Sequence, residues 1–249
     1  MSQQGKGLLW LALVVLLAAG AAFGLPRLAA LVPWRVEKSL ARASGFGGDG
    51  AACGERRPEA AAALAKVVAR LYPQSPEDAN FPLTVRVVSG SEVNAFAALG
   101  GRVSVYDGLL REAESPEELA GVLAHEIEHV RRRHIIQGVV ARLLTFGALQ
   151  HYAGSGASAA RNLLDLSFGR AQEREADQGG LERLRRARVG TAGYERFFVR
   201  RAGDSLFPAL LSDHPSSGDR AELVRSYRGG PADPVLTAAE WESLQSICR

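Results

Sequence analysis

The sequence predicts an α+β fold that is mostly helical, with a small β-sheet beside one central helix. Three observations lead to this fold class. Long helix-like segments make up most of the 249 residues, whereas only two segments have the β-branched composition of strands. A helix with a clear start signal at Ser115 follows the second strand. We therefore expect a mostly α-helical domain in which this helix packs beneath an edge strand.

The N-terminus is expected to be a membrane-directed segment. Leu8 to Phe23 contains no charged residue, and its length is short for a membrane span but long for a signal-peptide core. Lys6 and Trp10 favour an uncleaved anchor. Ala19-Gly20-Ala21 fits a cleavage site, so a removed signal peptide is the alternative. The expected organisation is a signal anchor or signal peptide over 1–24, a juxtamembrane segment with a Gly-rich linker over 25–54, and the folded domain over 55–249.

The first elements of the folded domain follow from local sequence signals. Pro58 to Leu71 is Ala-rich and reads as a helix that ends near Pro73. Leu83 to Val88 is a strand by its β-branched content, and Arg102 to Tyr106 alternates as a second strand after the Gly100-Gly101 turn. These segments predict the small sheet.

A capping box opens the next helix. Ser115 is placed at the N-cap, Pro116 at the first helical position and Glu118 at the third, and the helix runs on through His125 to His129. Three further segments complete the prediction. They are an apolar stretch over Ile135–Tyr152 that Gln137 and Arg142 interrupt, a long helical region over Asn162–Arg188, and a final helix that Thr237 to Glu240 caps; a loop over 153–158 separates the first two.

The charge distribution gives no indication of a nucleic-acid partner. The formal net charge is +3, and the arginines that dominate the positive charge are spread along the chain without a nucleic-acid-binding motif. The denser groups, Arg131 to Arg133 and Arg183 to Arg188, are interpreted as solvated helix faces. Contact with anionic lipid head groups is the alternative for them.

Cys53 and Cys248 are the only cysteines and lie near the two ends of the folded region. A disulfide between them would close a loop of nearly 200 residues, worth on the order of 4–5 kcal/mol in the chain-entropy model. Such a bond fits an oxidising compartment outside the cytoplasm, as does export through the N-terminal segment. Two free thiols are the alternative.

The stretch His125-Glu126-Ile127-Glu128-His129 is the most informative part of the sequence. On a helix, His125 and His129 lie about 40° apart and one turn from each other. Both imidazoles can therefore reach a single Zn²⁺, and Glu126 is placed to act as the base towards water at the metal.

A zinc site needs a third protein ligand. His134 is the nearest in sequence, but on a continuing helix it would point about 180° away from His125, so we interpret it as a structural or surface histidine. Glu173 and Asp177 share one helix face, so one could bind zinc while the other hydrogen-bonds a ligating histidine. A charged, solvated helix face is the alternative for this pair.

Several short motifs surround the zinc helix. Asn94 to Ala97 and the Gly100-Gly101 turn precede it, and Glu173 to Asp177 and His214-Pro215 to Arg220 follow it. In this order the motifs resemble those of the membrane-associated zinc metallopeptidases that include HtpX, CAAX prenyl protease 1 and the BepA-type enzymes. The resemblance covers roughly residues 83–224. This chain departs from the family because it lacks several membrane spans and C-terminal helical repeats. The resemblance therefore implies neither prenylated-protein processing nor partner recognition by such repeats.

The resemblance implies a zincin-like (gluzincin) metallopeptidase domain with one Zn²⁺ per chain. It implies that His125, His129 and Glu173 bind the zinc, that Glu126 is the base, and that Asp177 supports a ligand. His214 would lie near the metal, stabilising the oxyanion or capping the idle site, and a histidine in a turn before proline is the alternative. Arg220 is a second candidate for stabilising the oxyanion.

An extended protein substrate is expected to add a strand along Arg102 to Tyr106, with Asn94 to Ala97 lining the same groove. The expected substrate contacts are Asn94, Ala95, Phe96, Arg102, Val103, Ser104 and Val105; ordinary core strand and turn is the alternative for both segments. The expected function is a membrane-anchored zinc endopeptidase of envelope protein quality control, with its catalytic domain in the periplasm. A zinc-binding chaperone or assembly factor that seldom cleaves is the alternative.

Overall fold

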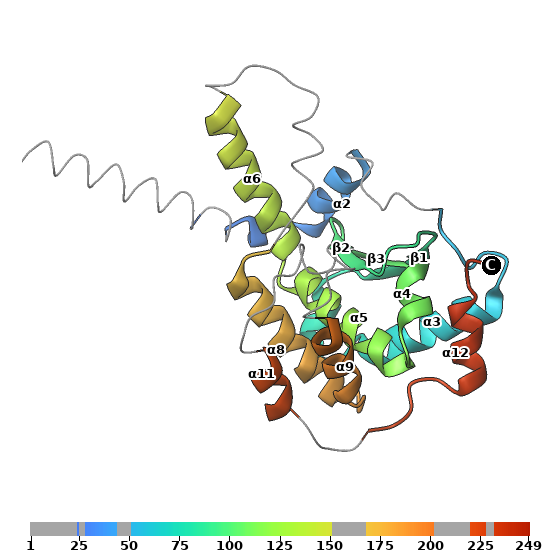
Figure 1. Ribbon diagram of the computed structural model, residues 1–249. Coiled ribbons are helices and arrows are strands. Elements are labelled where there is room, and N and C mark those ends of the chain that lie inside the picture. Colours follow the sequence, from blue (N-terminus) through green and yellow to red (C-terminus); the bar gives the residue numbers. More distant parts are fainter. Residues whose placement is uncertain (1–23, 25–27, 44–50, 151–167, 202–219, 228–231) are drawn as a thin grey trace, which may run out of the picture.

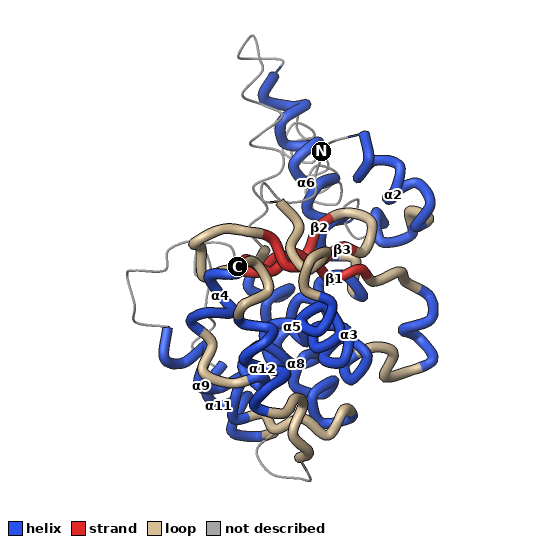
Figure 2. The backbone as a smooth tube through the Cα atoms, turned by 90° about the vertical axis from the view of Figure 1, so that its right-hand side faces the viewer, coloured by secondary structure: helices blue, strands red, loops and turns tan. Residues whose placement is uncertain are grey.

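A three-stranded sheet lies across one end of a group of helices whose central member is α5 (Figures 1 and 2). Helix α5 contacts helices α3, α6, α8 and α9 and the strands β2 and β3, so most of the core is organised around it. The computed structural model describes residues 24, 28–43, 51–150, 168–201, 220–227 and 232–249, without the side chains at 143–150, 198–201 and 220–221. In these residues the predicted α+β, mostly α-helical class is confirmed.

The described elements follow in chain order. They are η1 (Ala29–Leu31), α2 (Trp34–Ala43), α3 (Pro58–Leu71), η2 (Pro76–Asn80), β1 (Thr84–Val88), β2 (Ala95–Ala98), β3 (Arg102–Tyr106), α4 (Asp107–Glu112), α5 (Pro116–Arg131), α6 (His134–Gln150), α8 (Arg170–Arg186), α9 (Ala192–Arg201), α11 (Arg220–Ser226) and α12 (Ala238–Gln245).

The sheet has the strand order β1-β3-β2, with β1 parallel and β2 antiparallel to β3. Val103 of β3 is opposite Val85 of β1 on one side and Ala97 of β2 on the other. The prediction that Arg102 to Tyr106 forms the edge beside the zinc helix is therefore wrong. In the sheet formed by the described residues, the edge on this side is strand β2, which contains the predicted groove residues Ala95 and Phe96.

Helix α5 begins as predicted and is buried along almost its whole length. The Ser115 hydroxyl accepts a hydrogen bond from the backbone N–H of Glu118 at 3.3 Å, with Pro116 at the first helical position. The helix ends at Arg131, and Arg133 has a φ of 63°, in the left-handed region that side chains rarely adopt. This break starts α6 at His134 in a new direction. The helix therefore does not continue through His134.

Glycines allow two helices to approach α5 closely. A Cβ built on Gly180 of α8 would lie 3.2 Å from the backbone nitrogen of His125, and one on Gly121 of α5 would lie 2.9 Å from the Cα of Tyr194 in α9. Any larger side chain would push these backbones apart. The small residues thus set the distance at which α8 and α9 face the motif helix.

The other predicted helices are found with adjusted boundaries. Helix α3 spans Pro58–Leu71 as predicted, and α12 is capped by Thr237, whose hydroxyl accepts from the N–H of Glu240. The long helix α8 begins at Arg170, and its predicted start at Asn162 lies outside the described residues. The predicted N-terminal anchor over 1–24 and the 153–158 loop also lie almost wholly outside them. Of the helices that the structure describes, none combines the length and apolar character needed to cross a bilayer.

The segment before the folded domain packs onto it. Glu37 of α2 accepts a hydrogen bond from the backbone N–H of Gly100 at 2.8 Å and forms an ion pair with Arg133 at 2.9 Å. The Arg133 guanidinium also lies 3.7 Å from the ring centre of Trp34, a cation–π contact. Helix α2 is therefore fixed both to the turn between β2 and β3 and to the end of the motif helix.

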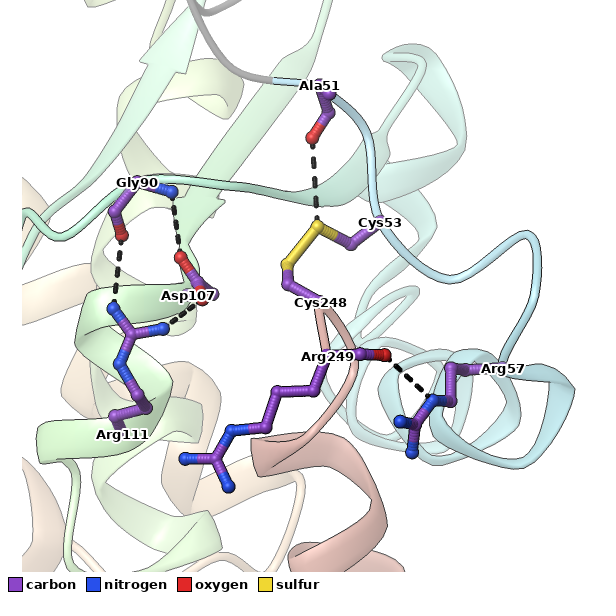
Figure 3. The surroundings of a disulfide bond; sticks show 8 residues. All are labelled: Ala51, Cys53, Arg57, Gly90, Asp107, Arg111, Cys248 and Arg249. Carbon is purple, nitrogen blue, oxygen red and sulfur yellow. Dashed lines mark hydrogen bonds and ion pairs between the residues drawn. A yellow bond between two sulfur atoms is a disulfide. The ribbon is translucent and has the colours of Figure 1, made fainter.

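A disulfide joins Cys53 to Cys248 and ties the C-terminus to the start of the domain (Figure 3). The two Cα atoms lie 5.0 Å apart across 195 residues of sequence. The backbone N–H of Cys53 donates to Val87 of β1, and Arg57 donates to the backbone carbonyl of Arg249 at 3.1 Å. The predicted pairing of the two cysteines is thus present in the structure.

Candidate metal centre

His125, His129 and Glu173 bring three potential metal ligands together in the core. Their ligand atoms all lie within 4.8 Å of one another, and all three side chains are fully buried. The Nε2 atoms of the two histidines are 3.1 Å apart. Glu173 places one carboxylate oxygen 3.6 Å from His125 Nε2 and the other 3.4 Å from His129 Nε2.

These separations fit a zinc ion. Tetrahedral zinc with bonds of roughly 2.0–2.1 Å holds neighbouring ligand atoms about 3.3–3.4 Å apart. The two histidine Nε2 atoms are 3.1 Å apart, close to that value, and the two oxygens of Glu173 come within 3.4 and 3.6 Å of one histidine each. Two imidazoles and one carboxylate also match the ligand set of catalytic zinc sites, which leave a fourth position open. The donor set and its spacing therefore suit a catalytic zinc.

Asp177 orients the first histidine ligand. Its carboxylate lies 3.0 Å from His125 Nδ1, one turn of α8 beyond Glu173, and is also hydrogen-bonded by the Tyr194 hydroxyl. A hydrogen bond from Nδ1–H to the carboxylate leaves the Nε2 lone pair facing Glu173 and His129, as a metal ligand requires. The geometry thus agrees with the supporting role that the resemblance implies for Asp177.

His134 occupies the equivalent position behind the second histidine ligand. Its Nδ1 is 3.0 Å from His129 Nδ1, and its Nε2 is 3.4 Å from a carboxylate oxygen of Glu175. Burial lowers the pKa of His134 to about 4, so the ring is neutral at neutral pH and its Nδ1 can accept the proton of His129 Nδ1–H. Phe168 stacks on the His129 ring with centroids 4.0 Å apart. The interpretation of His134 as a structural histidine fits this contact, but a surface position does not.

Glu126 lies next to the ligand cluster and contacts the sheet edge. Its side chain is buried, and one carboxylate oxygen accepts a hydrogen bond from the backbone N–H of Ala97 at 2.9 Å. In the antiparallel register, the backbone N–H and C=O groups of Asn94 and Phe96 point towards β3. The backbone N–H of Ala97 therefore points towards the other edge of β2. The candidate base and the outer edge of β2 therefore lie side by side.

A buried ionic network holds α8 against α5 behind the metal centre. Arg183 of α8 donates to both carboxylate oxygens of Asp78, at 2.9 and 3.0 Å, and to Glu128 of α5 at 2.8 and 3.1 Å. The other carboxylate oxygen of Glu128 accepts from Arg131 and Arg132. Arg183 thus does not belong to the solvated helix face expected for the Arg183–Arg188 group.

The predicted substrate contacts on β3 are corrected by the structure. Val103, Ser104 and Val105 are fully buried, and their backbone is paired with strands on both sides. Arg102 donates to the carbonyls of Leu99 and Ala41, which ties the sheet to α2. An extended chain cannot pair with this strand. Ala95 and Phe96 belong to the outer strand β2, and Asn94 directly precedes it. Contact with substrate stays a prediction for these three residues.

Two further predicted site residues cannot be placed in the centre. His214 lies outside the described residues. Arg220 is the first residue of α11, and its side chain is outside the described part of the chain. Sequence reasoning missed Tyr194 and Phe168, which contact the ligands from positions far along the chain. No local pattern marks either residue, because both reach the centre through tertiary packing.

The comparisons with known proteins agree with this geometry. The model of the family described as peptidase family M48 matches residues 58–228. The beta-barrel assembly-enhancing protease of Yersinia pestis is 32% identical over 184 residues, covering 66% of this chain and 38% of that protein. The metalloprotease LoiP of Escherichia coli strain K12 is 28% identical over 157 residues, covering 58% of this chain and 62% of LoiP.

A mitochondrial relative extends this range. The metalloendopeptidase OMA1 of Arabidopsis thaliana is 32% identical over 151 residues, covering 56% of this chain and 30% of OMA1. The chain spans less than two-fifths of the length of the matched beta-barrel assembly-enhancing proteases. The region that the family model matches contains the ligand cluster and strand β2.

Proposed function

The chain belongs to peptidase family M48, and from its buried ligand cluster we propose that it is a zinc-dependent metalloendopeptidase. The observation that carries the proposal is the contact between the cluster and the sheet edge. Three potential ligands meet in the core, and the candidate base beside them accepts a hydrogen bond from the backbone of β2, the outer strand of the described sheet. This contact supports the proposal that an extended peptide binds beside a hydrolytic metal.

His125, His129 and Glu173 would hold the zinc. When bound, zinc polarises a carbonyl oxygen and lowers the pKa of water towards neutrality. Glu126 accepts the proton of the attacking water and passes it to the nitrogen of the leaving amine. Burial keeps this carboxylate away from bulk water, and the N–H of Ala97 holds it in place before the substrate arrives.

The substrate is proposed to bind as an added strand on β2. The backbone groups of Ala95 and Ala97 point away from β3 and can pair with an extended chain. Backbone pairing reads an extended shape more than a particular sequence, which suits unfolded or misassembled proteins. The relatives named for beta-barrel assembly support a role in cell-envelope quality control.

A location outside the cytoplasm is part of the proposal. The disulfide between Cys53 and Cys248 is typical of proteins in oxidising compartments. The uncharged sequence from Leu8 to Phe23 supports export, with this segment as a membrane anchor or a signal peptide. We therefore place the proposed catalytic domain in the periplasm.

One observation favours a second function, a latent zinc-binding chaperone or assembly factor. The N–H of Ala97 that would pair with a substrate strand is occupied by Glu126. A substrate must displace this hydrogen bond before the base is free. Without a trigger that opens the contact, the site would bind zinc and extended chains but cleave slowly.

The test is digestion of casein by the full-length chain, comparing the wild type with Glu126→Gln and measuring zinc in both. The expected result is about one zinc per chain in each and a loss of cleavage of about 10²–10⁴-fold in the variant. Glu182→Gln on the outer side of α8 is the matched control and should cleave normally. Zinc in both with cleavage in neither would favour the latent function. Absence of zinc from both would contradict the metal site.

A further inference from the structure

Large apolar side chains are exposed in only one short segment of the described residues. Leu28, Leu31, Val36 and Leu40 have exposed fractions of 59, 77, 42 and 44%, whereas the other large apolar side chains of that part are buried or half-buried. These four exposed residues lie within thirteen positions of the sequence and are here together called the apolar face. A cluster of this kind marks a contact with another apolar phase.

The apolar face is not the side by which α2 packs on the domain. Val36 and Leu40 lie one helical turn apart on one stripe, while Glu37 and Ala41 form a second stripe and are buried against the domain. The two stripes are separated by about 100° around the helix. Helix α2 thus uses one side for the fold and presents an apolar stripe beside it.

The exposed charges of α2 are all positive. Arg35 and Arg42 are exposed and lie about 100–120° around the helix from Val36 and about 140–160° from Leu40. Long arginine side chains can extend around a helix towards lipid head groups. The single acidic residue of α2, Glu37, is buried and paired with Arg133. The charge around the apolar face therefore complements an anionic surface.

A second apolar element extends from the same end of the molecule. Helix α6 has seventeen residues, of which only Arg142 carries a formal charge. In Figures 1 and 2, α2 and α6 both extend from the end that carries the sheet, away from α9 and α11. Helix η1, which contains Leu31, packs against α6. The apolar face and α6 thus mark one end of the protein.

We propose that the apolar face docks in the plane of an anionic lipid bilayer. Leu28, Leu31, Val36 and Leu40 would enter the interface, and the Arg35 and Arg42 side chains would contact the phosphate groups. A second copy of the chain is a poorer occupant, because pairing two α2 helices face to face would bring like charges together.

Docking in this orientation would place the substrate edge near the membrane. The hydrogen bond from Gly100 to Glu37 links α2 to the turn that joins β2 to β3. Strand β2 therefore keeps a fixed position relative to the apolar face. Chains that emerge from, or fail to enter, the membrane would be the substrates presented first to that edge.

A fluorescent label at position 40 tests this docking in the full-length chain. Among the described residues the structure contains no free cysteine, and the sequence contains only the two in the disulfide, so Leu40→Cys supplies a single thiol for an environment-sensitive dye. Ala65→Cys, at an exposed position of α3, is the matched control. Both proteins are reconstituted into vesicles of phosphatidylcholine, alone or with phosphatidylglycerol, and the dye is also challenged with a nitroxide-labelled lipid.

The expected result is a blue shift at position 40 in the anionic vesicles, with quenching by the nitroxide lipid, and no change at position 65. Replacing Arg35 and Arg42 with glutamine should weaken docking by about 30-fold, at about 1 kcal/mol per charge. Three results would overturn the proposal. The first is dye emission at position 40 that does not change in any lipid, and the second is an equal blue shift in vesicles without phosphatidylglycerol. The third is emission that is already blue-shifted before lipid is added, which would mean that this chain or a second copy covers the apolar face.

Discussion

Removing the buried guanidinium of Arg183 should destabilise the whole fold. Its side chain is 4% exposed and joins two carboxylates, Asp78 and Glu128, whose side chains are 0 and 3% exposed. Replacing it with methionine keeps the volume but leaves both carboxylates without this partner. Breaking a buried ion pair by removing one member costs about 3–5 kcal/mol, because a charge stays buried without compensation.

Asp78 should contribute more to this loss than Glu128. Glu128 keeps ion pairs with Arg131 and Arg132, whereas among the described residues the Asp78 carboxylate keeps hydrogen bonds only from the backbone N–H groups of Gln74 and Ser75. A cost of 3–5 kcal/mol corresponds to a drop in Tm of roughly 6–20 °C for a chain of this size. Adding Asp78→Asn to Arg183→Met should therefore recover part of the lost stability.

The assay is urea denaturation followed by circular dichroism, with the disulfide kept oxidised. Arg186→Met is the matched control on the same helix. Arg186 forms an ion pair with Glu182, and the two side chains are 44 and 39% exposed. Loss of this pair should lower the free energy of unfolding by well under 1 kcal/mol. If Arg183→Met is no more destabilising than Arg186→Met, the network is not a source of stability and the reasoning fails.

Two further predictions concern metal affinity and acid stability. His134→Ala should weaken zinc binding by about 10–100-fold in a chelator competition, because His129 loses the partner of its Nδ1. Glu175→Gln should have a smaller effect, since that side chain is 54% exposed, and equal effects would contradict a role for the ring itself. Burial raises the pKa of Asp78, but the hydrogen bonds from Arg183 and the backbone outweigh burial and leave the pKa below its usual 3.8. The stability from this carboxylate is thus present above pH 3.8 and lost as the pH falls through the lower folded pKa, so urea midpoints should fall there in the wild type and less in Asp78→Asn.

The two histidine ligands could be predicted from local geometry, whereas the choice of Glu173 over Asp177 as the third ligand came from the family resemblance. His125 and His129, like Glu173 and Asp177, are four residues apart on a helix, and that spacing alone puts each pair on one face. Capping signals placed the start of α5 correctly for the same reason. Interactions within about one helical turn leave a readable pattern.

What the sequence did not reveal depends on contacts between distant segments. The order β1-β3-β2 places the second predicted strand in the middle of the sheet, because the short segment Ala95–Ala98 pairs with its other side. His134 contacts His129 across the break at Arg133, whose φ of 63° separates α5 from α6 and whose side chain forms an ion pair with Glu37 in α2. No spacing rule within one helix contains this information.

The arrangement of α8 explains why metal binding and folding are expected to depend on each other. This helix supplies a ligand, Glu173, a carboxylate that orients another ligand, Asp177, and the glycine that lets its backbone approach His125, Gly180. Arg183, at the far end of the same helix, joins α8 to α5 through Glu128, the residue immediately before the second histidine ligand. Any change that separates α8 from α5 therefore moves Glu173 away from both histidines. A protein that positions a metal in this way gains stability when the metal binds, because the ligand cluster and the helix contact are formed by the same two helices.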